Sequence, residues 1–236
     1  MKKLWISCIG VVLVGLVAAT GADASVNKNI RIEAGETSKG ASSVNGRVTV
    51  GDGAIVDGDV DTVNGGVKLG SGVQAGEVQS VNGKVTIGDD CVIETAQTVN
   101  GRAELGERVR VSGDVSTVNG EVNIGYGSLV GGDVDTVNGK VKLKGVSVSG
   151  DIGNTNGGVY LDEGTRVEGS VVVRKTKNYG WSWGKKSKPV VVIGRNVVVE
   201  GPLIFEREVE LYIHETATVG SIEGKAEVQR YSGDAP

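Results

Sequence analysis

The tripeptide Val-Asn-Gly recurs at a nearly constant interval along this chain of 236 residues, and Thr155-Asn156-Gly157 is a variant copy. Successive asparagines are 19, 18, 18, 19, 19 and 18 residues apart. A period of this length, with one structural turn per repeat, is typical of a β-solenoid. The asparagines of the repeat are Asn45, Asn64, Asn82, Asn100, Asn119, Asn138 and Asn156.

Each repeat predicts two short strands. The segment after Asn-Gly alternates apolar and polar residues, as in Val85-Thr86-Ile87, which is the two-residue period of a strand with one buried face. A second strand follows a Gly-Asp step, as at Asp59-Val60. Aromatic residues make up only 4% of the chain, so the core must consist of small β-branched side chains repeated in register.

We therefore expect an all-β fold, a single-stranded β-solenoid (β-helix) of about nine to ten rungs. Val26-Asn27 supplies an earlier, degenerate turn, and the segments around Val191 and Leu211 supply two later ones. Glycines such as Gly51, Gly70 and Gly88 mark the corners, where we expect positive φ angles.

The N-terminus has the features of a secretory signal. Lys2-Lys3 precede an apolar run from Leu4 to Ala19, and Ala22-Asp23-Ala24 is a small-x-small cleavage site. The run is shorter than the ~20 residues that span a bilayer, so we expect no transmembrane segment in the mature chain. The protein is predicted to be exported, to the periplasm or to the cell surface and extracellular space.

Cleavage after residue 24 removes two lysines and one aspartate, so the formal net charge changes from −4 to −5. A mildly acidic chain of this kind is not expected to bind nucleic acid. Cys91 is then the one cysteine left, and we expect it to be a buried, inert thiol.

The expected organisation has five parts. They are a signal peptide at 1–24, solenoid repeats at 25–173, a basic aromatic insertion at 174–189, terminal rungs at 190–222, and a C-terminal cap or tail at 223–236.

The asparagine column has two interpretations. Residue pairs such as Thr62/Asn64 and Thr98/Asn100 could form a regular outward array of hydroxyls and amides that binds water, ice or a polymer. Alternatively, each Asn lies at a corner before Gly, and the side-chain amides bond along the stack as a structural ladder. We favour the ladder because Asn-Gly is a strong turn dipeptide.

No catalytic or metal site is predicted, nor any cofactor. A column of acidic residues recurs at one corner, but the calcium-binding nonapeptide of β-rolls is absent, so we interpret these residues as exposed corner residues. His214 is the one histidine, and we expect it at the surface. The column is Asp59, Glu77, Asp114, Asp133 and Asp151.

The insertion breaks the repeat and is the best candidate for a binding site. It carries six basic residues and no acidic ones, with two tryptophans that suit stacking on sugar rings or gripping an anionic surface polymer. A hairpin folded back on the solenoid wall is the alternative. The candidate binding residues are Trp181, Trp183, Tyr179, Lys175, Lys177, Lys185 and Lys186.

The repeat resembles those of two groups of bacterial proteins. The Gly-Asp-Val and Val-x-Gly rungs resemble bactofilin-like, polymer-forming domains, and Asp61-Thr62-Val63-Asn64-Gly65-Gly66-Val67-Lys68-Leu69 resembles the strands of putative adhesin domains. The resemblance implies a non-enzymatic structural or adhesive element of the cell envelope, with self-association through the solenoid ends in the bactofilin-like case. Ile193-Gly194-Arg195-Asn196-Val197 also resembles the hexapeptide repeat of acyltransferases, which would imply an enzyme.

Export predicts a defined mature N-terminus. When the chain is expressed in a bacterium and recovered from the exported fraction, N-terminal sequencing should begin at Ser25. Recovery of a chain that retains residues 1–24, or of protein from the cytoplasm alone, would contradict the predicted signal.

Overall fold

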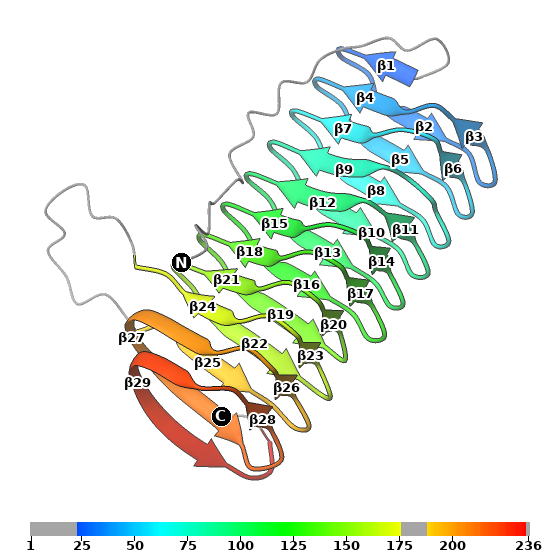
Figure 1. The fold of residues 1–236 in the computed structure, drawn as a ribbon. Coiled ribbons are helices and arrows are strands. Elements are labelled where there is room, and N and C mark those ends of the chain that lie inside the picture. Colours follow the sequence, from blue (N-terminus) through cyan, green and yellow to red (C-terminus); the bar gives the residue numbers. More distant parts are fainter. Residues whose placement is uncertain (1–22, 176–187, 235–236) are drawn as a thin grey trace, which may run out of the picture.

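The computed structural model describes residues 23–175 and 188–234, which form a rod of parallel strands stacked in about ten turns (Figure 1). The predicted fold class is confirmed. The described residues contain no helix, and hence none that is long and apolar enough to cross a membrane.

The turns of the rod form three walls, and most turns contribute one strand to each. The first wall contains β1 (Asp23–Ser25), β4 (Ala41–Ser43), β7 (Val60–Thr62), β9 (Glu77–Ser80), β12 (Thr95–Thr98), β15 (Val115–Thr117), β18 (Val134–Thr136), β21 (Ile152–Asn154) and β24 (Val171–Val173). The second wall contains β2 (Ile30–Ile32), β5 (Val48–Val50), β8 (Val67–Leu69), β10 (Val85–Ile87), β13 (Ala103–Leu105), β16 (Val122–Ile124), β19 (Val141–Lys144), β22 (Val159–Asp162) and β25 (Val190–Ile193).

The third wall is built from two-residue strands. They are β3 (Thr37–Ser38), β6 (Ile55–Val56), β11 (Val92–Ile93), β14 (Arg110–Val111), β17 (Leu129–Val130), β20 (Ser147–Val148), β23 (Arg166–Val167), β26 (Val198–Val199) and β28 (Thr218–Val219). In the turn of β7 and β8 the third wall has only Gln74, which bridges Ile55 and Val92. Two longer strands, β27 (Leu203–His214) and β29 (Ile222–Tyr231), cross from the first wall to the second in the last turns.

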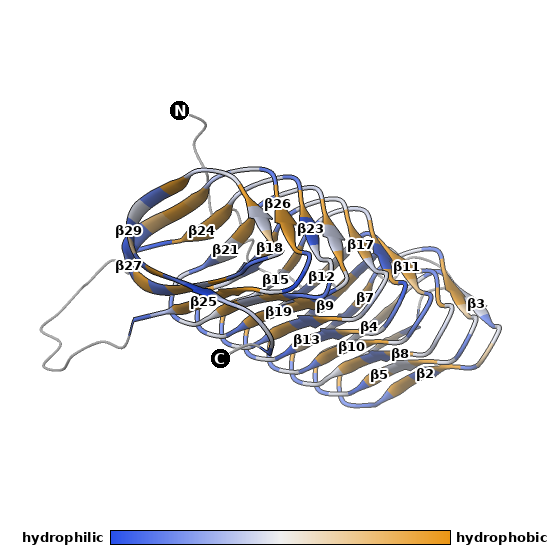
Figure 2. Ribbon diagram, turned by 90° about the horizontal axis from the view of Figure 1, so that it is seen from below, coloured by the Kyte–Doolittle hydropathy of each residue, from blue (hydrophilic) through white to orange (hydrophobic). Residues whose placement is uncertain are grey.

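The core is a set of columns of equivalent side chains. Val85 pairs in register with Val67 on one side and Ala103 on the other, and all three are 0–1% exposed. Along each strand the inward residues are apolar, except for buried hydroxyl residues such as Thr62 in the first wall, and the outward ones are largely hydrophilic, which gives the alternating colours of Figure 2. Burial of a Val, Leu or Ile side chain stabilises by roughly 1.5–3 kcal/mol, so the repetition of small residues replaces the large aromatic core of a globular domain.

The glycine after each asparagine is required by space. A Cβ built on Gly83 would lie 1.9 Å from the carbonyl oxygen of Gly65, and one on Gly120 would lie 1.6 Å from that of Gly101. Neither glycine has a positive φ. The backbones of successive turns therefore approach too closely at this corner for any side chain larger than hydrogen.

The expectation of positive φ at Gly51, Gly70 and Gly88 is wrong. These glycines also lie against the backbone of the preceding turn, whereas left-handed residues occur further along the same corner. That left-handed position is mostly glycine, as at Gly53 and Gly72, but Asp90 and Arg108 occupy it with φ of 59° and 55°. Non-glycine residues in this region are strained, so the corner needs other contacts to hold it.

The C-terminal segment forms a strand. We expected residues 223–236 to form a cap or tail, and the structure places Ile222–Tyr231 in β29, paired in parallel with β27. Ile222 and Val228 are in register with the buried Leu203 and Leu211, yet they are 39% and 48% exposed because β29 is the last strand of the stack.

The glycine corner gives a matched pair of variants. A Cβ on Gly65 would lie 2.1 Å from the Gly46 carbonyl oxygen, whereas one on the adjacent Gly66 would lie 3.0 Å from that of Lys84. Gly65→Ala should lower the free energy of unfolding in urea by about 2 kcal/mol or more. Gly66→Ala should cost less than about 1 kcal/mol, and equal effects would show that space does not select Gly65.

Candidate functional site

The side chains of the repeated asparagines form a continuous ladder on the outside of the rod. Asn82 Nδ2 donates to Asn64 Oδ1 at 2.9 Å, and Asn100 Nδ2 donates to Asn82 Oδ1 at 2.8 Å. The ladder begins at Asn27, so the degenerate first turn belongs to the stack. The same bond links Asn45, Asn64, Asn119, Asn138 and Asn156 to the preceding asparagine at 2.8–2.9 Å.

The hydroxyls two residues before each asparagine do not share its face. Thr62 and Thr98 are buried. The Thr62 hydroxyl donates to the Gly46 carbonyl of the preceding turn, and the Thr98 hydroxyl donates to that of Gly83, both at 2.8 Å. Asn154 replaces the hydroxyl in one turn and donates to the Gly139 carbonyl at 2.9 Å. The outward Thr-x-Asn array considered above is therefore wrong, because its hydroxyls lie inside the wall.

The ladder ends at Asn156, before the insertion in the sequence. Asn156 is its last asparagine, and Arg207 Nη1 lies 3.4 Å from Asn156 Oδ1. Arg207 belongs to β27, whose strand continues through the corner without an Asn-Gly step. An arginine from a later turn thus supplies a donor where the repeated asparagine is missing.

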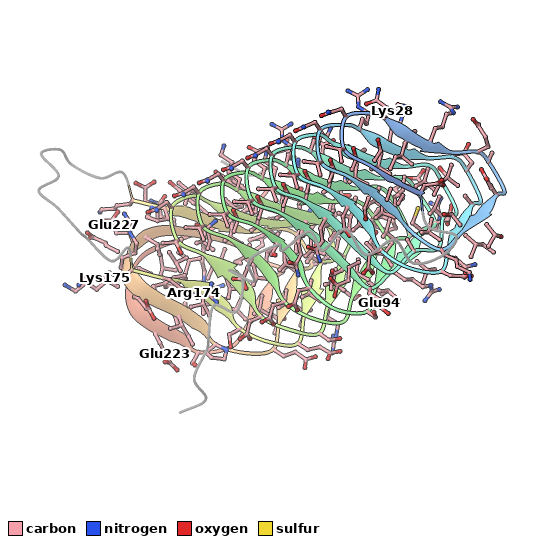
Figure 3. All side chains as sticks on the ribbon, turned by 90° about the horizontal axis from the view of Figure 1, so that it is seen from above. Lys28, Glu94, Arg174, Lys175, Glu223 and Glu227 are labelled. Carbon is pink, nitrogen blue, oxygen red and sulfur yellow. The ribbon has the colours of Figure 1, made fainter. Side chains whose placement is uncertain are left out.

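The two ends of the insertion are attached to the solenoid. The backbone N–H of Lys175 donates to Glu206 Oε2 at 2.9 Å, and Lys188 Nζ pairs with Glu208 Oε1 at 3.2 Å and with Glu227. Figure 3 shows Lys175 and Glu227 at the C-terminal end of the rod. Of the predicted binding residues Lys175 is exposed, whereas Tyr179, Trp181, Trp183, Lys177, Lys185 and Lys186 lie outside the described residues.

The acidic corner column stabilises the backbone. Asp59 Oδ1 accepts the backbone N–H of Glu77 at 3.0 Å, and Asp133 Oδ1 accepts that of Asp151 at 2.7 Å. Asp114 and Asp151 do the same for the next turn. Each of these aspartates thus accepts a hydrogen bond from a backbone N–H group that the strand pairing leaves without an acceptor. Among residues 23–175 and 188–234, no group of three or more His, Cys, Asp or Glu is arranged to hold a metal ion.

The outer side of the first wall is acidic. Burial, followed by the charges of Asp59 and Glu77, raises the pKa of Asp61 to about 7. Arg174 Nη1 pairs with Asp135 Oδ1 at 2.6 Å, and Gly153 lies between them where a Cβ would collide with both side chains. The acidic residues of this wall and its edge are Asp59, Asp61, Glu77, Asp114, Asp133, Asp135 and Asp151.

The outer side of the second wall is predominantly basic. Glu104 pairs with Lys84 and with Arg102 at 3.2 Å, and Glu121 lies 3.5 Å from Arg102 and 3.8 Å from Lys142. Among the described residues, Arg47 and Lys68 have no ion-pair partner. The basic residues of this wall and its edges are Arg31, Arg47, Lys68, Lys84, Arg102, Lys140, Lys142 and Lys144.

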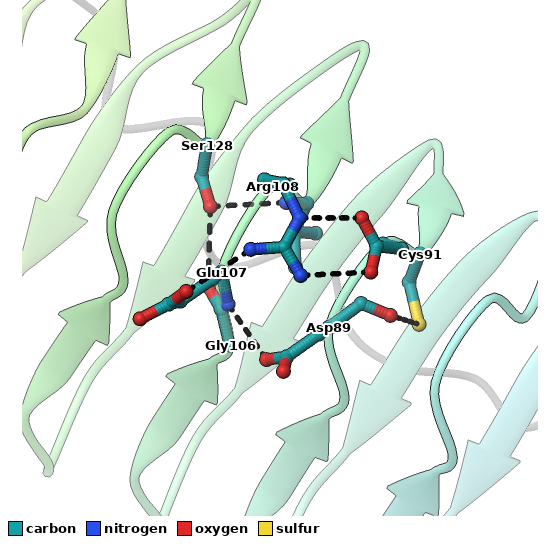
Figure 4. Close-up of polar contacts among 8 residues, drawn as sticks. Asp89, Cys91, Gly106, Glu107, Arg108 and Ser128 are labelled. Atoms are coloured by element: carbon teal, nitrogen blue, oxygen red, sulfur yellow. Dashed lines mark hydrogen bonds and ion pairs between the residues drawn. The ribbon is translucent and has the colours of Figure 1, made fainter.

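Ion pairs reinforce the strained corner between the second and third walls (Figure 4). Arg108 donates to both carboxylate oxygens of Asp90, at 2.7 and 2.9 Å, and to Glu107 at 3.0 Å. These bonds join two of the four non-glycine residues that have positive φ among the described residues. The hydrogen bond from Arg108 holds the pKa of Asp90 below its usual value.

Cys91 lies just inside this corner and is fully buried, as expected from the sequence. Its Sγ lies 3.0 Å from the Gly70 carbonyl oxygen, and burial raises the pKa of the thiol. The neutral thiol form is therefore favoured, which suits a packing residue and not a nucleophile.

The expectation of a surface histidine is wrong. His214 ends β27 and is 3% exposed, with Nδ1 2.9 Å from Thr216 Oγ1 and the ring edge-on to Tyr231 at 5.1 Å. Its Nε2 is buried without a hydrogen-bond partner in the described part of the chain. A histidine enclosed in this way does not present a base to a bound substrate.

Two grooves lie on the outside of the rod. One, of about 470 Å³, lies on the second wall beside Asn123, Lys142 and Tyr160. The other, of about 500 Å³, lies by the third wall, where Val92 and Leu129 are 46% and 42% exposed. Neither groove is predicted from the sequence, although the outward positions of each strand follow from the two-residue period.

Comparison of this chain with protein-family models, with curated proteins and with solved structures finds no match. The β-solenoid fold is established by the structure alone, and the walls, the grooves and the insertion are the features that bear on function.

Proposed function

We propose that this chain is a non-enzymatic, exported structural and adhesive rod of the bacterial cell envelope. The observation that carries the proposal is the separation of charge between two flat walls of one rigid body. The first wall and its edge carry seven carboxylates, from Asp59 to Asp151, one of which is paired with Arg174. The second wall and its edges carry eight basic side chains, from Arg31 to Lys144, interrupted by Glu104 and Glu121.

The proposed mechanism is passive contact. Parallel strands fix the outward side chains at roughly 4.8 Å intervals, so a partner meets a regular row of charges that need no ordering on binding. The acidic wall of one copy complements the basic wall of another, and such a contact repeats without closing. The resemblance to polymer-forming and adhesin domains is consistent with this function.

Side-by-side association should depend strongly on salt. We expect rods to associate laterally at about 0.01 M salt and to separate at about 1 M, because the screening length falls from about 30 to about 3 Å. Sedimentation velocity and electron microscopy measure this directly. A monomer at low salt and high protein concentration would contradict lateral association, and end-to-end filaments would favour the bactofilin-like mode.

Two lysines give a matched control. Lys68 is exposed on the second wall, and Lys39 is exposed at the corner that precedes the first wall. Lys68→Glu should weaken association at low salt, whereas Lys39→Glu, which changes the net charge equally, should have little effect. Equal effects would mean that net charge and not the basic wall controls association.

A second candidate function is binding of a cell-wall polysaccharide or an anionic surface polymer through the 174–189 insertion. The contacts of Lys175 with Glu206 and of Lys188 with Glu208 favour it, because they fix both ends of the insertion on the rod.

The test for this candidate replaces Trp181 and Trp183 with Ala. Retention on purified cell-wall or lipopolysaccharide material should fall about tenfold, because each tryptophan can stack on a sugar ring. Unchanged retention would eliminate the insertion as the binding site.

A further inference from the structure

The outward residues of the second wall change in character toward the C-terminal end. In the earlier turns this column carries Thr49, Lys68, Thr86 and Glu104, whereas Tyr160, Val192 and Tyr212 follow one another in register in β22, β25 and β27. Val192 is 4% exposed although it lies on the outer side of the wall. The three residues form an apolar strip along the rod, which we call the tyrosine strip.

The ring of Tyr160 lies against the wall. A Cβ on Gly158 would be 2.6 Å from Tyr160 Cε2 and 3.0 Å from its hydroxyl oxygen, so the ring leans over a position without a side chain. Lys140 Nζ lies 5.5 Å from the ring centroid. A ring that lies along a sheet in this way is a platform on which a flat, partly apolar group can stack once the flexible Lys140 side chain moves aside.

The groove of about 470 Å³ adjoins this platform. Its lining comes from four successive strands of the second wall, β13, β16, β19 and β22, and from Gly125 directly after β16. Because equivalent residues of successive turns line it, the groove runs along the rod axis. Gly125 leaves one side of it without a side chain. Its polar and aromatic lining side chains are Asn123, Lys142, Lys144, Tyr160 and Asp162.

The polar groups of the groove are mixed in sign. Lys142 and Lys144 are donors. Lys142 also lies 3.8 Å from Glu121, and Lys144 lies 3.1 Å from Glu163. Asp162 is an acceptor, and its Oδ1 already accepts the backbone N–H of Glu163 at 2.9 Å. Asn123 Oδ1 is buried and has no hydrogen-bond partner among the described residues. An unpaired acceptor is costly unless a donor reaches it, so the groove favours a ligand that carries hydroxyl groups.

We propose that the groove and the tyrosine strip form a binding site for a linear, uncharged, hydroxyl-rich glycan that lies along the rod axis. Sugar hydroxyls donate to Asn123 Oδ1 and Asp162 and accept from Lys142 and Lys144, while a sugar face stacks on Tyr160. The inference deepens the adhesive function proposed above, but it differs in ligand and in salt dependence from the charge-based contact of the walls.

The test is affinity electrophoresis of the purified protein in gels that contain one of three uncharged linear polysaccharides: hydroxyethyl cellulose, glycol chitin or xylan. Retardation by at least one of them, unchanged at higher salt, is expected. Tyr160→Ala and Asn123→Ala should each weaken it, the former about tenfold, whereas Tyr160→Phe should retain it. Thermal unfolding of each variant shows whether the rod is intact.

Tyr126→Ala is the matched control, because Tyr126 is 58% exposed and lies outside the groove lining. No retardation in any of the three gels, or equal retardation of Tyr160→Ala and Tyr126→Ala, would overturn the site. A fourth gel contains alginate, which is a charged polysaccharide. Retardation in the alginate gel alone, lost at higher salt, would also overturn the site and would leave the charge-based contact of the walls in place. If the rods do not associate at low salt but the glycan is still bound, the wall contact is contradicted and the groove is not.

Discussion

The close approach of successive backbones at the Asn-Gly corner is the constraint on which the rest of this structure depends. The backbone N–H of Asn82 donates to the Val63 carbonyl at 2.7 Å, and the asparagine side chains repeat the same bond on the outside at 2.8–2.9 Å. Inside, buried hydroxyls such as that of Thr98 bind the glycine carbonyls. Because all three bonds repeat in each of the regular turns, every equivalent residue lies directly above its counterpart.

This stacking has an electrostatic cost, since like residues become neighbours at strand spacing. On the acidic side the carboxylates accept backbone N–H groups of the next turn, as Asp133 does from Asp151. Burial still raises the pKa of Asp133, and the nearby carboxylates add to that shift. On the second wall, Glu104 and Glu121 interrupt the row of basic side chains and pair with them. Exposed pairs of this kind contribute little to stability, so their main effect is to reduce repulsion.

Departures from the repeat gather at the C-terminal end. The asparagine ladder ends at Asn156, the tyrosine strip begins at Tyr160, and the sequence repeat is interrupted at the insertion. A monotonous stack provides rigidity, whereas recognition needs residues that differ from turn to turn. The groove, the strip and the two attached ends of the insertion therefore lie where a binding surface is most easily built without disturbing the stack.

The sequence by itself determined the solenoid, its period and the two main strands of each turn, because the in-register burial of small apolar residues needs a strict repeat. The sequence also contains a signal for the third wall, an apolar residue before each x-Gly step, as at Val111 and Val130. A two-residue strand is too short, however, to show an alternating pattern that can be recognised. Tertiary structure alone decided that Asn82 faces outward while Thr98 faces inward, and that Gly83 is needed for space and not for its φ. It also decided that Asn123, Lys142 and Tyr160, from three separate turns, line one groove. These outcomes depend on how one turn lies on the next, and a linear pattern does not contain that distance.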